Sequence, residues 1–181
     1  MKLDFSGYGL KRKNPADITD NPITMFSRDW ALVAAGNRER FNALTVAWGA
    51  LGTAWGNGRP LAIIFVSPSR FTHEFLEREK GFSINVLPVE FRKIMGYMGS
   101  RSGRDEDKIA ESGLEYAFTE RETPVFTQSR LILNCEKIYS HTIERDRFGE
   151  TLKSVYAAPV FKGVDPHTVY FGEITDCWAR D

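Results

Sequence analysis

Short hydrophobic runs recur along the chain, and their spacing is more typical of strands than of helices. Residues 44–48 combine alternating and β-branched positions, whereas residues 61–66 (LAIIFV) are apolar without interruption. A continuous run of this kind is typical of a strand that is buried on both faces. Residues 82–87 alternate again. Further strands are expected at residues 23–36 (one or two), 123–126, 130–141 and 167–179.

Helical periodicity is confined to short segments between these runs. A helix is expected after residues 61–66, with Ser69 or Thr72 as its capping residue. Residues 89–98 carry apolar side chains at helical spacing, and a third short helix is expected to begin near Asp105. Strands therefore outnumber helices, and the alternation of strand and helix is not sustained enough for a doubly wound sheet. We predict a mainly β fold, an antiparallel barrel with a few helices over an opening.

Glycines at positions 49, 52, 56 and 58 separate two of the predicted strands. Their spacing is not GxGxxG and no helix follows directly, which argues against a dinucleotide-binding Rossmann turn. We expect residues 49–58 to form a glycine-rich connection in which the backbone approaches a ligand or another segment closely. A polar hairpin loop is expected at residues 36–42, and a charged connection at residues 142–166.

Length and composition are those of an ordinary globular chain. The 181 residues can bury one sizeable core. We divide them into an N-terminal surface arm, residues 1–22, and a single domain, residues 23–181. The 24 basic and 24 acidic residues cancel, which argues against a nucleic-acid partner. The apolar run at residues 61–66 is too short to cross a bilayer, and no membrane association is expected.

Two cysteines, Cys135 and Cys177, are too few for a disulfide framework and match no zinc-ligand spacing. Both fall in predicted strands, so we expect buried structural thiols. The first residues contain no apolar leader, and a cytoplasmic, reducing setting is expected.

Nucleophilic and metal-dependent chemistry have little support. The chain has no GxSxG motif, and neither cysteine lies in a glycine-rich turn beside a histidine. The three histidines are far apart in sequence, and none belongs to an HExxH-like spacing, so no metal site is expected. Paired acids for sugar hydrolysis stay open, but nothing singles out a pair.

Two polar loops carry more chemistry. The first combines hydroxyl groups, a guanidinium and the start of a predicted helix, and comprises Ser67, Ser69, Arg70 and Thr72. The second has a similar composition and comprises Ser100, Arg101, Ser102, Gly103, Arg104 and Lys108. Donors of this kind suit a phosphate, although a capped helix with a solvated arginine explains the first loop slightly better when it is taken alone. Two such loops in one small neutral domain favour a phosphate-bearing ligand.

Four segments together carry a resemblance to a known family. NALTVAWGALGT, followed by an apolar strand and PSRFTHEFLE, resembles the flavin reductase-like proteins of the FMN-binding split-barrel superfamily. YMGSRSGRDEDKIAESGL is similar to the corresponding loop and helix of flavoredoxin-like members, and HTVYFGEI to their closing strand. The similarity extends over residues 24–178. It implies an antiparallel split β-barrel of Greek-key type, a homodimer with FMN held non-covalently near the subunit interface.

The resemblance also assigns residues to the ligand. The isoalloxazine ring would contact, mainly through main-chain groups, Asn42, Leu44, Thr45, Val46, Ala47 and Trp48. The ribityl chain and phosphate would contact Ser67, Ser69, Arg70 and Thr72, with Ser100, Ser102, Gly103 and Lys108 completing the anionic pocket. His167 would take a catalytic position near the open face of the flavin, where a nicotinamide could stack. This chain departs from the family in having Ala47 and Trp48 where relatives commonly have a small hydroxyl residue.

The implied function is that of an NAD(P)H-dependent flavin reductase, in which NADH or NADPH delivers hydride to N5 of FMN. Reduced flavin would then serve a monooxygenase or a redox-protein partner. One alternative is an FMN-binding electron-transfer protein, similar to flavoredoxin, that a protein partner reduces. A second alternative is a non-catalytic split-barrel binding module that has lost the flavin.

Overall fold

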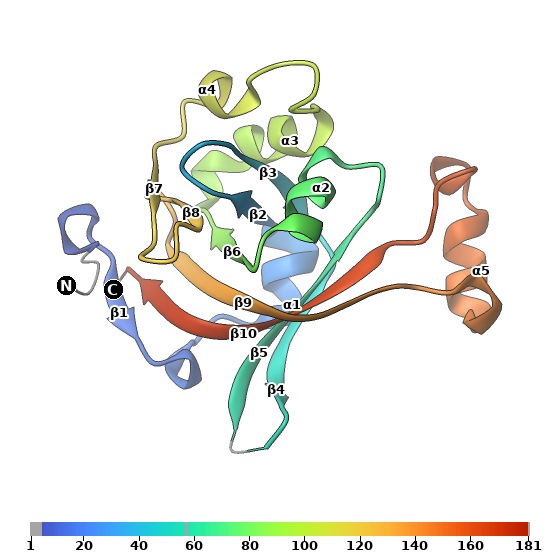
Figure 1. Cartoon of the computed structure of the whole chain (residues 1–181), viewed down its shortest axis with the longest axis horizontal. Coiled ribbons are helices and arrows are strands. Elements are labelled where there is room, and N and C mark those ends of the chain that lie inside the picture. Colours follow the sequence, from blue (N-terminus) through green and yellow to red (C-terminus); the bar gives the residue numbers. More distant parts are fainter. Residues whose placement is uncertain (1–4, 57, 181) are drawn as a thin grey trace.

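The strands of the protein form one large antiparallel sheet that curls into a barrel (Figure 1). The computed structural model describes residues 5–56 and 58–180. Within them the strands are β1 (Lys11–Lys13), β2 (Ala31–Gly36), β3 (Phe41–Val46), β4 (Gly49–Ala54), β5 (Arg59–Val66), β6 (Gly81–Val86), β7 (Tyr116–Phe118), β8 (Pro124–Phe126), β9 (Leu131–Thr142) and β10 (Thr168–Ala179). The main sheet has the order β3-β2-β6-β9-β10-β5-β4, with β1 paired to β10, while β7 and β8 form a separate hairpin. The predicted mainly β, antiparallel fold is confirmed.

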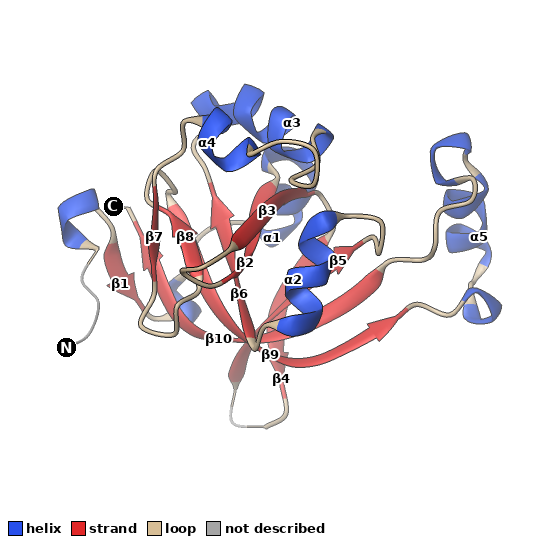
Figure 2. Ribbon diagram, turned by 45° about the horizontal axis from the view of Figure 1, so that its top comes forward, coloured by secondary structure: helices blue, strands red, loops and turns tan. Residues whose placement is uncertain are grey.

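Short helices lie between the strands and cover the sheet at one end (Figure 2). The α-helices of the described chain are α1 (Pro22–Thr24), α2 (Phe71–Arg78), α3 (Arg92–Ser100), α4 (Lys108–Ser112) and α5 (Glu150–Ala157). A π-helical turn, Met25–Asp29, follows α1 directly. None of the described helices is long and apolar enough to cross a membrane.

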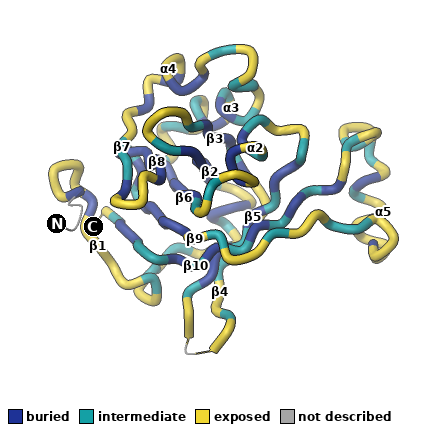
Figure 3. Tube along the Cα trace, in the orientation of Figure 1, coloured by how far each residue is buried: buried dark blue, intermediate teal, exposed yellow. Residues whose placement is uncertain are grey.

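The core explains why β2 is apolar at every position. Val33 and Ala35 point into the barrel, whereas Leu32 and Ala34 pack with Met95 of α3 on the other face. Strand β2 is thus buried on both faces, because the barrel core covers one face and the cluster that includes α3 residues covers the other. Strand β5, for which the sequence predicts this environment, keeps only alternate residues fully buried. Figure 3 shows burial concentrated in the barrel strands, while the α5 segment and the tip of the β4–β5 hairpin are largely exposed.

Two local expectations are wrong, each for a physical reason. Residues 23–29 are helical rather than extended, because the Asn21 side chain accepts hydrogen bonds from the amides of Ile23 and Thr24 and starts a helix. The glycine-rich segment is strand β4 rather than a connection, and it pairs with β5 along its whole length. Gly49 is needed there because the ring of Phe26 occupies the space of a side chain.

The charged connection at residues 142–166 contains helix α5, which the sequence did not predict. Figure 1 shows this segment standing away from the barrel at the far ends of β9 and β10. Part of the predicted surface arm also belongs to the sheet, since β1 pairs with β10 and Phe5 and Leu10 are buried beside Trp178. Residues 1–4 of the arm lie outside the described residues.

Candidate functional site

Strand pairing brings together three segments that are far apart in sequence. In the β10–β5 pair, Thr168 lies opposite Val66, so His167 lies near Ser67 at the end of β5. The link between β3 and β4 reaches the same place, because the amide of Phe65 donates a 3.4 Å hydrogen bond to the carbonyl of Trp48. The carboxyl ends of β3 and β5 and the start of β10 therefore meet.

A cavity of about 300 Å³ opens where these ends meet, and we call it the aromatic pocket. Its lining residues are Leu44, Thr45, Val46, Ala47, Trp48, Phe65, Val66, Ser67, Ser69, Arg70, Val160, Phe161, Val164 and His167. One wall comes from β3 and its continuation, and the outer wall comes from the segment after α5. The wall is mainly apolar and aromatic, which suits a flat ligand.

A second cavity of about 100 Å³, here the anion pocket, adjoins the first. It is lined by Leu44, Ser69, Arg70, Phe71, Thr72, Met98, Gly99, Ser100, Arg101, Ser102, Gly103 and Lys108. Three residues, Leu44, Ser69 and Arg70, line both cavities, so the two form one continuous site. The structure thus brings the two predicted donor loops together.

Lys108 is a buried cation in the anion pocket, and only 3% of it is exposed. Its Nζ donates hydrogen bonds to the carbonyl oxygens of Met98 (2.9 Å) and Arg101 (3.1 Å). Burial, together with the nearby positive charge of Arg70, lowers the pKa of Lys108 to about 8. No carboxylate among the described residues lies within ion-pair distance of Nζ. A buried charge without a counterion is costly, so this pocket favours an anion.

The arginines of the anion pocket differ in their partners. Arg104 pairs with Glu74, and Arg101 lies 3.7 Å from Glu106. Arg70 donates to the carbonyl of Gly99 at 3.2 Å and, within the described part of the chain, has no carboxylate partner. Arg70 and Lys108 are therefore the two cations that remain available to a ligand.

The hydroxyl groups of the first loop do not cap helix α2. Its N-cap position is Arg70, which makes no side-chain capping bond. The hydroxyls of Ser67 and Ser69 lie 2.9 Å apart, and Thr72 accepts a 2.8 Å hydrogen bond from Asn42. The predicted capping role of Ser69 or Thr72 is wrong, because each hydroxyl has another partner.

Asn42 lines neither cavity, unlike the other predicted cofactor-binding residues. Its buried side chain connects β3 to α2 through Thr72 and lies directly behind Gly103. A Cβ on Gly103 would overlap Oδ1 of Asn42 and lie 3.0 Å from its Cγ. Asn42 thus sets the position of the second loop from behind.

Several predicted donors have internal partners. Thr45 donates a 2.6 Å hydrogen bond to the carbonyl of Met95, and Ser100 donates to the carbonyl of Tyr97 at 3.1 Å. Ser102 accepts from the amide of Arg104 at 3.2 Å. These bonds fix the cavity wall, and they leave mainly backbone groups and the two cations for a ligand.

His167 lies at the outer end of the aromatic pocket among other rings. Its ring centroid is 4.7 Å from that of Trp48 and 6.1 Å from that of Phe161. Nδ1 is 2.7 Å from the hydroxyl of Tyr156 in α5. Burial and the charge of Arg70 lower the pKa of His167 to about 4, so the ring is neutral near pH 7.

Sequence reasoning missed the residues that α5 and its flanks bring to the site. Val160, Phe161 and Val164 line the aromatic pocket, and Tyr156 contacts His167 from behind. All four lie in the stretch that was predicted to be a charged connection. Their only signal is the presence of aromatic and aliphatic residues among the charged ones of this segment, including Phe148, Tyr156 and Phe161.

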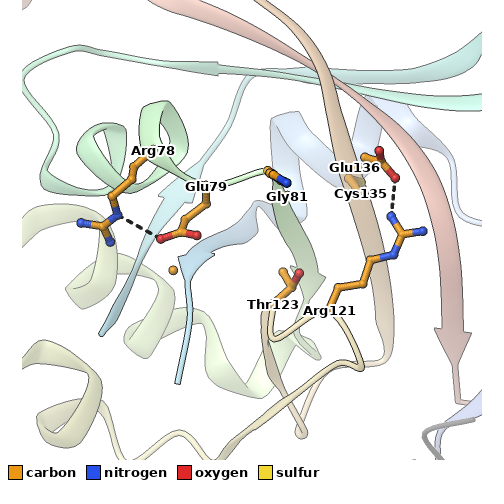
Figure 4. Close-up of a pocket in the computed structure, with 9 residues that line it drawn as sticks. Arg78, Glu79, Gly81, Arg121, Thr123, Cys135 and Glu136 are labelled. Atoms are coloured by element: carbon orange, nitrogen blue, oxygen red, sulfur yellow. Dashed lines mark hydrogen bonds and ion pairs between the residues drawn. The ribbon is translucent and has the colours of Figure 1, made fainter. Parts of the chain in front are cut away.

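Another pocket, of about 400 Å³, lies away from this site (Figure 4). Its charged groups already face each other as pairs, Arg78 with Glu79 and Arg121 with Glu136. Cys135 lies at its wall, and burial raises the pKa of this thiol, which keeps it unreactive. Both cysteines are free and buried, as the sequence predicts.

This chain has relatives of known sequence and of known structure. The high molecular weight rubredoxin of Moorella thermoacetica is 27% identical over 117 residues, which are 64% of this chain and 50% of that protein. This chain therefore spans about half the length of that relative.

Two solved structures share the fold. An FMN-binding protein from Thermus thermophilus, with bound 1-cyclohex-2-enone, superposes with a TM-score of 0.64 at 22% identity, covering 90% of this chain and 78% of that one. Flavoredoxin from Methanosarcina acetivorans gives a TM-score of 0.62 at 22% identity, covering 84% and 69%. The sequence pattern of the flavin reductase like domain matches residues 24–181. The chain belongs to the flavin reductase-like family.

Proposed function

We propose that this protein holds FMN in the two connected cavities and acts as an NAD(P)H:FMN oxidoreductase. One observation carries the proposal: two cations without a carboxylate partner, Arg70 and Lys108, lie at one end of a site whose other end is aromatic. That distribution matches a molecule that is flat at one end and carries a phosphate at the other.

The residues present fit such a ligand. Arg70 and Lys108 of the anion pocket supply charge-assisted hydrogen bonds, which are stronger than neutral ones. Gly103 lets the loop backbone approach the pocket, because no side chain fits between it and Asn42. Bound FMN would supply the electron acceptor, taking up hydride at N5 from NADH or NADPH. The chain itself would position the ring and exclude water, so the transfer needs little acid–base help from the side chains of the aromatic pocket.

A second candidate function is that of an FMN-binding electron carrier. It is favoured by the contact between Trp48 and Phe161, whose ring centroids are 5.8 Å apart, next to His167 at the outer end of the aromatic pocket. A nicotinamide that stacked at this end of the pocket would have to displace these rings. A protein partner that delivers single electrons would not have to displace them.

One experiment separates the two functions and tests both. Under anaerobic conditions the FMN-loaded protein is expected to bleach with NADH or NADPH faster than free FMN does. Bleaching by chemically reduced rubredoxin alone would support the electron carrier instead. A protein that neither quenches the fluorescence of added FMN nor gains visible absorbance would refute both and indicate a non-catalytic module.

We further propose that the protein is a homodimer, in which a second copy of the chain covers the surface beside the β4–β5 hairpin. Trp55, Ile138 and Tyr139 expose large apolar surfaces along the β4–β5 hairpin and β9, and they line a groove of about 520 Å³. Strand β4 is also an edge of the sheet, and an apolar edge of this kind is normally covered. A reducing, cytoplasmic setting, with a monooxygenase or redox protein as the acceptor of electrons, belongs to the same proposal.

Replacing Arg70 with Ala is expected to weaken FMN binding by about tenfold. This effect is at the lower end of the range for a hydrogen bond to a charged group, because the guanidinium of Arg70 is exposed to solvent. Riboflavin lacks the phosphate, so its affinity should change much less. Fluorescence titration with both ligands measures the difference. An equal loss for the two ligands would mean that Arg70 acts only through its bond to the carbonyl of Gly99.

A further inference from the structure

Tyr156 joins helix α5 to the aromatic pocket through two hydrogen bonds at one oxygen. Its hydroxyl lies 2.7 Å from Nδ1 of His167 and 3.0 Å from the backbone nitrogen of the same residue. Tyr156 is buried, and its ring also contacts Phe148 and Phe161. The hydroxyl is therefore held in place and shielded from water.

The direction of these two bonds follows from the donors available. The backbone amide of His167 can only donate, so the hydroxyl oxygen of Tyr156 accepts from it. The hydroxyl proton then has one partner within the described chain, Nδ1 of the imidazole. If Nδ1 carried a proton instead, the buried hydroxyl would accept twice and its own proton would be unpaired, which is costly.

We infer that Tyr156 is a positioning residue, which holds His167 in the neutral tautomer with the proton on Nε2. His167 then presents a hydrogen-bond donor to a carbonyl oxygen of the ligand in the aromatic pocket. The donor role of His167 toward a ligand rests on the proposed function, whereas the tautomer follows from the contacts of the chain alone.

The surroundings of the imidazole oppose a second proton on it. Trp48 and Phe161 cover the ring with apolar surface, and Arg70 contributes a positive charge from the loop before α2. On the α5 side, the guanidinium of Arg145 lies 5.6 Å from the ring centroid of Tyr156. With its pKa lowered to about 4, His167 neither gains nor loses a proton near pH 7. Its part in the reaction is to donate a hydrogen bond rather than a proton.

The accepting carbonyl belongs either to the flavin ring or to the carboxamide of a nicotinamide. Both offer the same chemistry, and sequential titration distinguishes them. If the Nε2–H resonance of His167 shifts when FMN alone is added, the flavin is the acceptor. If it shifts only when NAD⁺ follows, the acceptor is the carboxamide. A resonance that moves with neither ligand would overturn the donor role.

The tautomer itself is tested by heteronuclear NMR of the histidine ring nitrogens in the ligand-free protein. There are three histidines, so the His167→Gln variant assigns the signal. At neutral pH we expect a protonated Nε2 and an unprotonated Nδ1. In Tyr156→Phe the two tautomers should mix, whereas Tyr116→Phe, which removes the hydroxyl of an exposed tyrosine on β7, should leave the pattern unchanged. A protonated Nδ1, or a charged ring, in the unaltered protein would overturn the inference.

Kinetics supply a second, independent readout. Tyr156→Phe is expected to slow reduction by about three- to tenfold, the loss of one neutral hydrogen bond, while FMN affinity stays within about twofold. His167→Gln keeps an amide donor near the place of Nε2 and should lose less activity than His167→Phe. Equal losses in the Gln and Phe variants would refute the donor role. If the FMN-loaded protein is not reduced by any nicotinamide, the proposed function fails, yet the NMR experiment still decides the tautomer.

Discussion

Replacing Lys108 with Met is expected to weaken FMN binding by about ten- to a hundredfold and to leave riboflavin binding nearly unchanged. A hydrogen bond to a charged group contributes roughly 1.5–3 kcal/mol, and Lys108 is buried where water screens its charge little. Met keeps a side chain of similar length, so the wall of the anion pocket stays filled. Isothermal titration with the two ligands measures the effect.

The same lysine predicts how binding depends on pH. In the free protein the pKa of Lys108 is lowered to about 8, and a bound phosphate would raise it again. FMN affinity should therefore be fully present below about pH 8 and should fall as the pH rises above this value, by up to about tenfold per pH unit. In Lys108→Met the affinity should not change over this range. A wild-type affinity that stays constant from about pH 7 to about pH 9 would show that Lys108 does not face the phosphate.

Introducing a side chain at Gly103 is expected to damage the site and the fold together. In Gly103→Ala the new methyl group would overlap the amide of Asn42, which is itself buried and bonded to Thr72. Overpacking of this kind costs about 1–3 kcal/mol. Because the loop must move away from Asn42 to relieve it, FMN affinity should fall by at least about tenfold as well.

Gly96 provides the matched control. It lies within helix α3, and a Cβ there would meet no atom within 4 Å. Gly96→Ala should raise the stability by roughly 0.5–1 kcal/mol, since Ala is the better helix former, and leave FMN binding unchanged. Urea unfolding and FMN titration compare the two variants. If both lose the same stability, the contact between Gly103 and Asn42 does not limit the loop.

Most strands could be predicted because successive side chains of a strand point to opposite faces of the sheet, which produces a recognisable pattern of apolar and polar residues. Alternation of apolar and polar residues predicts strands where β9 and β10 lie. In the structure the two strands pair with each other in antiparallel orientation. Helix α5 could not be predicted, because its N-cap residue, Gly149, has no side chain that could form a capping hydrogen bond. Tyr156 is also the only buried residue of the helix, so its apolar periodicity is weak. Strand β4 was missed because its glycines resemble a loop, and tertiary contacts with the ring of Phe26 and the carbonyl of Ile63 explain Gly49.

For the site, the sequence identified the donor loops but not which donors are available. Arg101 and Arg104 resemble Arg70 in sequence, and only tertiary contacts pair them with Glu106 and Glu74. Asn42 shows the reverse case. The sequence predicts that Asn42 contacts the ring, but its buried amide donates to Thr72 and the residue lines neither cavity.

The way in which the α5 segment joins the barrel has a consequence for how specificity could change. Thr142 and Thr168 lie opposite each other in β9 and β10, and the amide of Ile143 donates to the carbonyl of His167 at 3.0 Å. The segment between β9 and β10 therefore leaves the sheet and returns to it at neighbouring points. Its length can vary at little cost, because loop-closure entropy grows only slowly with length. The segment between β9 and β10 can therefore be replaced, in evolution or by design, to change the outer wall of the site without altering the barrel.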